Sequence, residues 1–308
     1  MIDEPWLLVP ACGVLGLLIG SFLNVVVYRL PIILKRSWAN DASDYLTEEE
    51  IQLSLALSAE ERKEVTAAAA TVKKALGALP PFSLSKPRSR CPACGHPISA
   101  LENVPVISYL VLRGRCKACK TRISPRYPIV EALNGLLFAA AAVTFGFTPA
   151  LPAALVIIGI LVSLTLIDAD TMLLPDVLTL SLLWLGLLTS ASHYGFVPLS
   201  DSVAGAALGY AAFWLIATLF RVLRGVEGMG AGDFKLLAAL GAWFGWTALL
   251  PIVLLSAGVG SVVGITLMVI GRATMLSRLP FGVYLAPAGI LMLFYGRELT
   301  ALVLPGGS

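Results

Sequence analysis

Long apolar runs limit what this chain can fold into more than any other feature of its sequence. A helix rises about 1.5 Å per residue, so about 20 apolar residues cross the ~30 Å hydrocarbon core of a bilayer. The runs predict spans at 6–28, 128–147, 151–167, 177–192, 202–221, 234–247, 249–270 and 283–303. With 57% hydrophobic residues, 13% charged residues and a mean hydropathy of +0.85, we expect an all-α polytopic membrane protein with about eight transmembrane helices.

Charged residues predict how these helices are oriented. Asp3 and Glu4 precede the first run, whereas a secretory signal peptide needs a basic region there. Arg29, Lys35 and Arg36 follow the same run, so the positive-inside rule predicts a periplasmic N-terminus and a cytoplasmic segment after it. The net charge of +3 is too small to indicate nucleic-acid binding, and the lipid bilayer is the expected surrounding.

A single long polar stretch interrupts the apolar runs. It predicts three parts, which are a first transmembrane helix at 1–28, a cytoplasmic domain at 29–127 and a seven-helix membrane domain at 128–308. The sequences at 47–50 and 58–61 both read as capping boxes, and they predict helices near 48–57 and 59–76. The second of these helices is alanine-rich and is expected to be a solvated spacer.

Four cysteines in two CxxC pairs predict a metal site in the polar stretch. Cys91 and Cys94 form the first pair, and Cys116 and Cys119 form the second. Two such pairs supply the four thiolates of a tetrahedral zinc site, and Gly95 suits the tight turn after the first pair. A reducing cytoplasm disfavours disulfides. Four thiolates leave no position for a water, so we expect this zinc to stabilise the domain and not to catalyse.

Ionisable residues at the ends of apolar runs are the candidate catalytic groups, because a charge at membrane depth is costly unless it has a function. Asp233 follows Gly230 and Gly232 and precedes Lys235, at the start of an apolar run. Glycines let one backbone approach another closely. We therefore expect Asp233 to lie against another segment that carries its partner.

Three acids at the end of the third span are the candidate partners. Asp168 follows the apolar run directly and is the expected partner, Asp170 is its competitor, and Asp176 is expected to cap the next helix. Two carboxylates in a site of low dielectric share a proton, so one takes a proton from water while the other donates to the scissile carbonyl. The pair Asp168 and Asp233 therefore predicts an aspartic protease.

Two other functions use the same acids. One is an intramembrane aspartyl protease with another substrate, such as remnant signal peptides. The other is a transporter that relays protons or binds a cation with its paired acids. A transporter needs polar groups through the membrane midplane, whereas the spans at 151–167 and 249–270 carry no charge.

The motifs, taken in order, resemble those of bacterial type IV prepilin peptidases of the bifunctional kind. The matching features are residues 20–31, the two CxxC pairs, residues 105–109, 113–116 and 123–128, Glu131, Asp168 with residues 174–176, the GxGD sequence at 230–233 with Lys235, and residues 280–282.

This resemblance implies an inner-membrane aspartyl protease of the GxGD type, with Asp168 and Asp233 as its catalytic pair. It implies cleavage of the basic leader from prepilins and pseudopilins of type IV pilus or type II secretion systems, at the cytoplasmic face. The cysteine-containing domain implies a second activity, which is methylation of the new amino terminus, usually phenylalanine, with S-adenosylmethionine. The methyl-donor site is not assigned.

Overall fold

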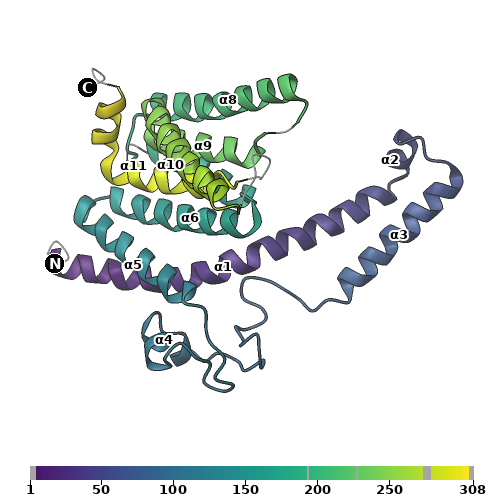
Figure 1. The fold of residues 1–308 in the computed structure, drawn as a ribbon, viewed down its shortest axis with the longest axis horizontal. Coiled ribbons are helices and arrows are strands. Elements are labelled where there is room, and N and C mark those ends of the chain that lie inside the picture. Colours follow the sequence, from purple (N-terminus) through teal and green to yellow (C-terminus); the bar gives the residue numbers. More distant parts are fainter. Residues whose placement is uncertain (1–4, 193, 227, 273–278, 305–308) are drawn as a thin grey trace. The chain divides into compact units, whose positions relative to one another are not determined.

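The computed structural model describes residues 5–192, 194–226, 228–272 and 279–304, and every named element in these ranges is a helix (Figure 1). All eight predicted apolar runs are helical. They form α1 (Pro5–Thr47), α5 (Arg126–Phe145), α6 (Ala150–Thr171), α7 (Asp176–Ala191), α8 (Leu199–Arg224), α9 (Ala231–Phe244), α10 (Leu249–Val269) and α11 (Gly282–Val303). Six of them are long and apolar enough to cross a membrane. The other two, α7 and α9, have 16 and 14 residues and are shorter than a span requires.

The first helix is much longer than the sequence predicts. α1 has 43 residues and continues from the expected end at residue 28 to Thr47. Residues 32–47 contain neither glycine nor proline, so no strong helix breaker ends α1 between its predicted end and Thr47. The segment after the first span is therefore helical and not a loop at its start.

One of the two predicted capping boxes is wrong. Thr47 lies in the last turn of α1 and donates to the Asp44 carbonyl at 2.7 Å, so it cannot cap α2 (Glu49–Ser54). The second box is confirmed at the start of α3 (Ala59–Gly77), where Ser58 and Glu61 exchange hydrogen bonds. Backbone and side-chain hydrogen bonds from Ser58 hold the pKa of Glu61 below its ordinary value.

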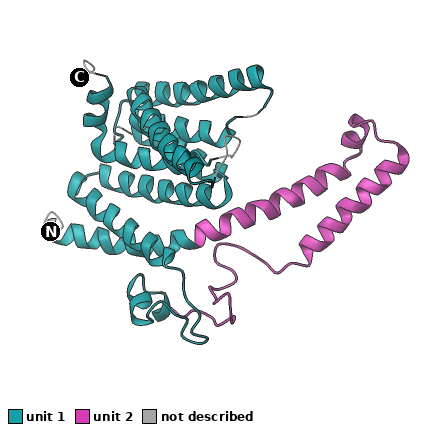
Figure 2. Cartoon of the chain, in the orientation of Figure 1, with its two compact units in different colours: residues 1–24, 100–308 teal, residues 25–99 magenta. Residues whose placement is uncertain are grey.

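The chain forms two compact units, which Figure 2 shows in different colours. Unit 1 contains Met1–Asn24 and Ala100–Ser308, and unit 2 contains Val25–Ser99. These units divide the chain by its contacts, and the three-part division predicted from the sequence stays a prediction.

Unit 2 is a helical hairpin whose two long arms are joined by polar contacts. Lys73 on α3 forms an ion pair with Asp44 on α1. Gln52 on α2 is buried, and its amide donates to the Thr66 hydroxyl at 2.9 Å. Arg29 is also buried, and hydrogen bonds satisfy its charged side chain. The guanidinium donates to the backbone carbonyls of Ser83, Leu84 and Pro87, in the segment that follows α3.

In unit 1, α1 packs closely on α5 through small residues. A side chain at Gly16 would lie 2.7 Å from the Asn134 carbonyl oxygen, and one at Gly20 would lie 2.8 Å from the Glu131 Cα. The buried Asn134 amide donates to the Gly16 carbonyl at 2.7 Å. Asn24 donates to the Tyr127 carbonyl at 3.2 Å, which is the interhelical role expected of a polar residue at that depth.

The core of unit 1 surrounds α9. Residues 236–243 of α9 are all buried, and α7, α8, α10 and α11 all contact this helix. Gly205 and Gly209 on α8 let the two backbones meet, since a side chain at either would overlap the main chain of α9. A helix that is apolar on all sides belongs in such a position.

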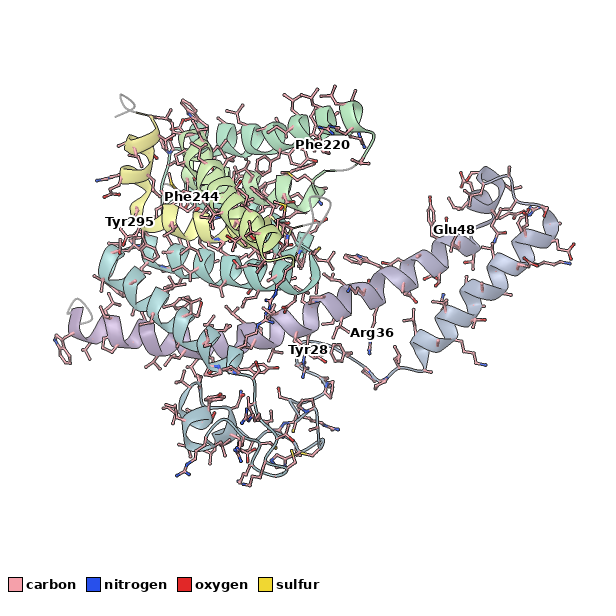
Figure 3. The ribbon with its side chains drawn as sticks, viewed as in Figure 1. Tyr28, Arg36, Glu48, Phe220, Phe244 and Tyr295 are labelled. Carbon is pink, nitrogen blue, oxygen red and sulfur yellow. The ribbon has the colours of Figure 1, made fainter. Side chains whose placement is uncertain are left out.

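The last helix bends at a different residue from the one expected. A proline inside a helix usually ends or kinks it, but α11 continues through Pro287 and departs from helical geometry at Tyr295, with φ −126° and ψ 27° (Figure 3). Proline inside a transmembrane helix is tolerated where neighbouring groups compensate for the lost hydrogen bond.

Candidate active site and metal centre

Asp168 lies in the last turn of α6 and is 4% exposed. Its Oδ2 accepts a hydrogen bond from the backbone N–H of Val283 at 3.0 Å, in the first turn of α11. Gly282 makes this approach possible, because a Cβ there would lie 2.8 Å from Oδ2 of Asp168 and 2.9 Å from Cδ2 of Leu174. The start of α11 thus holds the carboxylate from a position that is remote in sequence.

Asp233 lies in the first turn of α9 and is 9% exposed. Gly232 beside it has no room for a side chain, because a Cβ would lie 2.8 Å from the Cβ of Leu174. Leu174 therefore packs against both Gly232 and Gly282, so the same side chain meets the segments that hold the two acids. The charge of Asp168 acts on the Asp233 carboxylate, and the structure brings the predicted pair together.

The other two acids of the region each have a cationic partner. Asp170 forms an ion pair with Arg126 at 2.7 Å, and both oxygens of Asp176 accept from Lys235 at 2.7 Å. No ion pair involves Asp168 or Asp233 in the ranges that the structure describes. Asp170, the expected competitor, is thus separated from the pair by its contact with Arg126. Asp176 is the first residue of α7 and not its N-cap, which is Pro175.

The supporting residues are only partly those that the sequence indicates. Gly232 makes a close contact, whereas a Cβ at Gly230 would make only ordinary contact, 3.7 Å from Oδ2 of Asp233. Lys235 contacts Asp176 and not the buried pair. No sequence motif indicates a role for Val283 or Leu174. The available signal is a glycine, residue 282, directly before an apolar run.

The two cysteine pairs form equivalent backbone turns. In the first, Cys91 N–H donates to the His96 carbonyl and Gly95 N–H donates back to the Cys91 carbonyl, both at 2.9 Å. In the second, Cys116 N–H donates to the Thr121 carbonyl at 2.9 Å and Lys120 N–H donates back to the Cys116 carbonyl at 3.0 Å. Gly95 has a φ of 73°, as its predicted position in the tight turn requires, and Lys120 has a φ of 59° at the corresponding place.

The four thiols form a cluster that fits a metal ion. The sulfur atoms of Cys91, Cys94, Cys116 and Cys119 all lie within 4.8 Å of one another. Tetrahedral zinc with bonds of about 2.3 Å places its thiolates about 3.8 Å apart, so small movements of these side chains complete the shell. Since all four donors are thiols, the cluster suits a soft or borderline ion.

Together, the fold and these two sites define a helical membrane protein with a buried acid pair and a four-thiol cluster. A family model described as "Bacterial Peptidase A24 N-terminal domain" matches residues 14–145, and one described as "Type IV leader peptidase family" matches residues 155–265. No solved structure matches the chain.

Similar proteins carry the name "Prepilin leader peptidase/N-methyltransferase". One from Aeromonas hydrophila is 46% identical over 296 residues, covering 96% of this chain and 93% of the relative. One from Pseudomonas putida is 44% identical over 97% of this chain and 94% of its own length. One from Neisseria gonorrhoeae is 44% identical over 85% and 82%. The chain belongs to the family of prepilin leader peptidase/N-methyltransferases.

Proposed function

We propose that this chain is an aspartic endopeptidase that removes the basic leader from type IV prepilins and pseudopilins, and that it then methylates the new amino terminus. The relatives' name supports both activities. The observation that carries the aspartic mechanism is the pair Asp168 and Asp233, which are buried, close enough to interact, and without an ion pair in the described ranges. Two buried acids of this kind are candidates for proton transfer.

The surroundings of the two acids suggest different roles for them. Asp168 accepts a backbone N–H from Val283, which fixes the orientation of its carboxylate. Asp168 is therefore assigned as the base that takes a proton from the attacking water. Asp233 is assigned as the acid that donates its proton to the carbonyl oxygen of the scissile bond. Collapse of the tetrahedral intermediate then returns a proton to the leaving amine, which becomes the new amino terminus.

The membrane position of the acids suits a substrate that is itself an apolar helix with a polar leader. Asp168 ends a candidate membrane helix and Asp233 begins an apolar one, so both lie where an apolar run meets a polar segment. We place this end of the bundle, and the cysteine-containing segment, on the cytoplasmic side of the inner membrane, in accord with the positive-inside rule. The scissile bond of a helix lying against the bundle would then reach the acid pair.

The proposed zinc site would stabilise the cysteine-containing segment, to which we assign the methylation. Cys91, Cys94, Cys116 and Cys119 would hold the ion, and zinc bound by four thiolates supplies a cross-link and no reactive water. S-adenosylmethionine is the proposed methyl donor, on the ground of the relatives' name. Family membership disfavours the transporter hypothesis, and the substrate test below separates prepilins from other membrane substrates.

The test is expression of the full chain with a prepilin, followed by mass spectrometry of the pilin. Wild type should give a leaderless, methylated product. Asp168→Asn and Asp233→Asn should each abolish leader removal, whereas Asp170→Asn, which removes only an acid paired with Arg126, should retain it. Cleavage by both single mutants at the wild-type rate would refute the aspartic mechanism. Cleavage of a remnant signal peptide but not of a prepilin would refute the proposed substrate.

A further inference from the structure

A surface pocket of about 590 Å³ lies between the second cysteine turn and the start of α5. It is lined by the residues around α4 (Ile107–Val111) and the turn that follows, chiefly Tyr109, Arg113, Arg115, Arg122, Ser124 and Pro125. The three arginines make its lining strongly basic. The candidate active site does not include any of these residues, and the metal ligands Cys116 and Cys119 are not among those that line it.

The arginines are held close to one another although they repel. Arg115 and Arg122 face each other across an isolated antiparallel bridge. Residues opposite each other in such a bridge have Cβ atoms about 5 Å apart, and like charges in that position are destabilising. No ion pair involves Arg113, Arg115 or Arg122 in the described part of the chain. A bound anion would remove this repulsion.

The backbone that carries the arginines is held in one conformation. Arg113 has a φ of 51°, which is unfavourable for a residue with a side chain, and Gly114 follows with a φ of 65°. Gly114 N–H donates to the Tyr109 carbonyl at 2.8 Å, and Ile123 N–H donates to the Gly114 carbonyl at 2.7 Å. A Cβ at Gly114 would lie 2.9 Å from the ring of Tyr109. The pocket is therefore pre-organised, with its strain confined to the turn that presents Arg113.

We propose that this pocket binds a phosphate group through Arg113, Arg115 and Arg122. Guanidinium groups bind phosphate oxygens in a bidentate manner, and several together suit a group that carries more than one oxygen. The hydroxyl of Tyr109 is a further donor in the lining. S-adenosylmethionine fits poorly, because its sulfonium and ammonium groups outweigh its single carboxylate and would be repelled by the three cations. This inference is independent of the proposed function.

Two sources of phosphate suit the pocket, an anionic lipid headgroup and a soluble phosphate. Ser124 and Pro125 directly precede α5, which is a candidate membrane span, so the pocket adjoins the end of a helix where headgroups lie. Basic pockets at the ends of membrane helices bind anionic headgroups. We therefore expect phosphatidylglycerol to bind better than inorganic phosphate.

The test is binding to the full chain in detergent, with native mass spectrometry for phosphatidylglycerol and phosphatidylcholine and calorimetry for inorganic phosphate. Arg122→Gln should weaken phosphatidylglycerol binding about tenfold or more. Lys120→Gln is the matched control, because it removes one positive charge from the same cysteine turn without lining the pocket. It should bind as wild type does. Arg113→Gln is a second variant in case Arg122→Gln fails to fold, which circular dichroism would reveal.

The outcomes distinguish the two sources of phosphate and also show whether the pocket binds phosphate at all. Preference for phosphatidylglycerol that is lost in Arg122→Gln and kept in Lys120→Gln supports the headgroup. Inorganic phosphate binding with the same dependence, and no preference among lipids, supports a soluble ligand. The proposal is overturned if the arginine variants bind both ligands like wild type, or if Lys120→Gln weakens binding as much as they do.

Discussion

Four aspartates at one end of the helical bundle fall into two classes. Asp168 and Asp233 are buried and interact with each other, whereas Asp170 and Asp176 are more exposed and pair with Arg126 and Lys235. The side chains are chemically identical, and Asp168 and Asp170 are only two residues apart. The comparison shows that surroundings, and not residue type, separate the two classes. A carboxylate that is buried away from water and has no cationic partner is available for proton transfer.

The largest expected effect is loss of the buried pair. Asp168→Asn or Asp233→Asn should lower the rate of leader removal about 10³-fold or more, because each removes one of the two proposed proton-transfer groups. Single-turnover cleavage of a synthetic prepilin measures the rate. Asp170→Asn and Asp176→Asn are matched controls from the second class. The distinction between the classes fails if either control loses as much activity as the pair.

The next effect concerns how Asp168 is held. Gly282→Ala places a Cβ 2.8 Å from its Oδ2 and 2.9 Å from Leu174, so the carboxylate or the start of α11 must move. Displacement of a catalytic group by about 1 Å can reduce turnover about 10²-fold. Gly296→Ala on the same helix is the control, since a Cβ at Gly296 would lie no closer than 3.7 Å to another group, which is Cε of Met292. A comparison of kcat in the two variants measures the effect.

If Gly282→Ala retained wild-type kcat with an intact fold, the start of α11 would not position Asp168. A loss of thermal stability without a loss of kcat would give the glycine a packing role only.

A smaller effect on cleavage is expected from the metal ligands. Cys91→Ser should lower methylation about tenfold or more, because a missing thiolate weakens the proposed zinc site, which we expect to stabilise the cysteine turns. Leader removal should change less, since Asp168 and Asp233 lie on α6 and α9 and not in the segment between α3 and α5 that carries the cysteines. Zinc content by atomic absorption and product mass measure the two effects. Full methylation by a zinc-free Cys91→Ser protein would contradict the structural role of the metal.

The smallest effect should come from the paired acids. Lys235→Gln and Asp176→Asn, alone and together, test an ion pair whose side chains are 26% and 59% exposed. A pair of this exposure contributes about 0–1 kcal/mol, so thermal unfolding should give a coupling energy in that range and cleavage should change within about threefold. A coupling energy well above that range, or abolished cleavage in Lys235→Gln, would indicate that Lys235 contributes to the function of the buried pair.

Sequence reasoning located the helices better than it located their ends. Every predicted apolar run is helical, but α1 extends far beyond its predicted end, because residues 32–47 contain neither glycine nor proline. Residues 47–50 match the capping-box pattern. However, α1 extends to Thr47, so this residue lies inside the preceding helix and does not cap α2. In the same way, the proline in α11 is not where the helix bends, since its surroundings decide whether the lost hydrogen bond matters.

The sequence by itself determined which residue types are present and at what spacing. Apolar runs specify membrane helices because hydrophobic length must match the bilayer, and two CxxC pairs specify four thiolates because tetrahedral ligation needs that number. The tertiary structure alone decided which acids are buried and which are paired. Contacts of Asp168 with Val283, and of Leu174 with Gly232 and Gly282, join residues far apart in the chain. The local pattern favours Asp168, which follows the apolar run directly, over Asp170. It does not give their burial or their partners, because these arise from packing between helices.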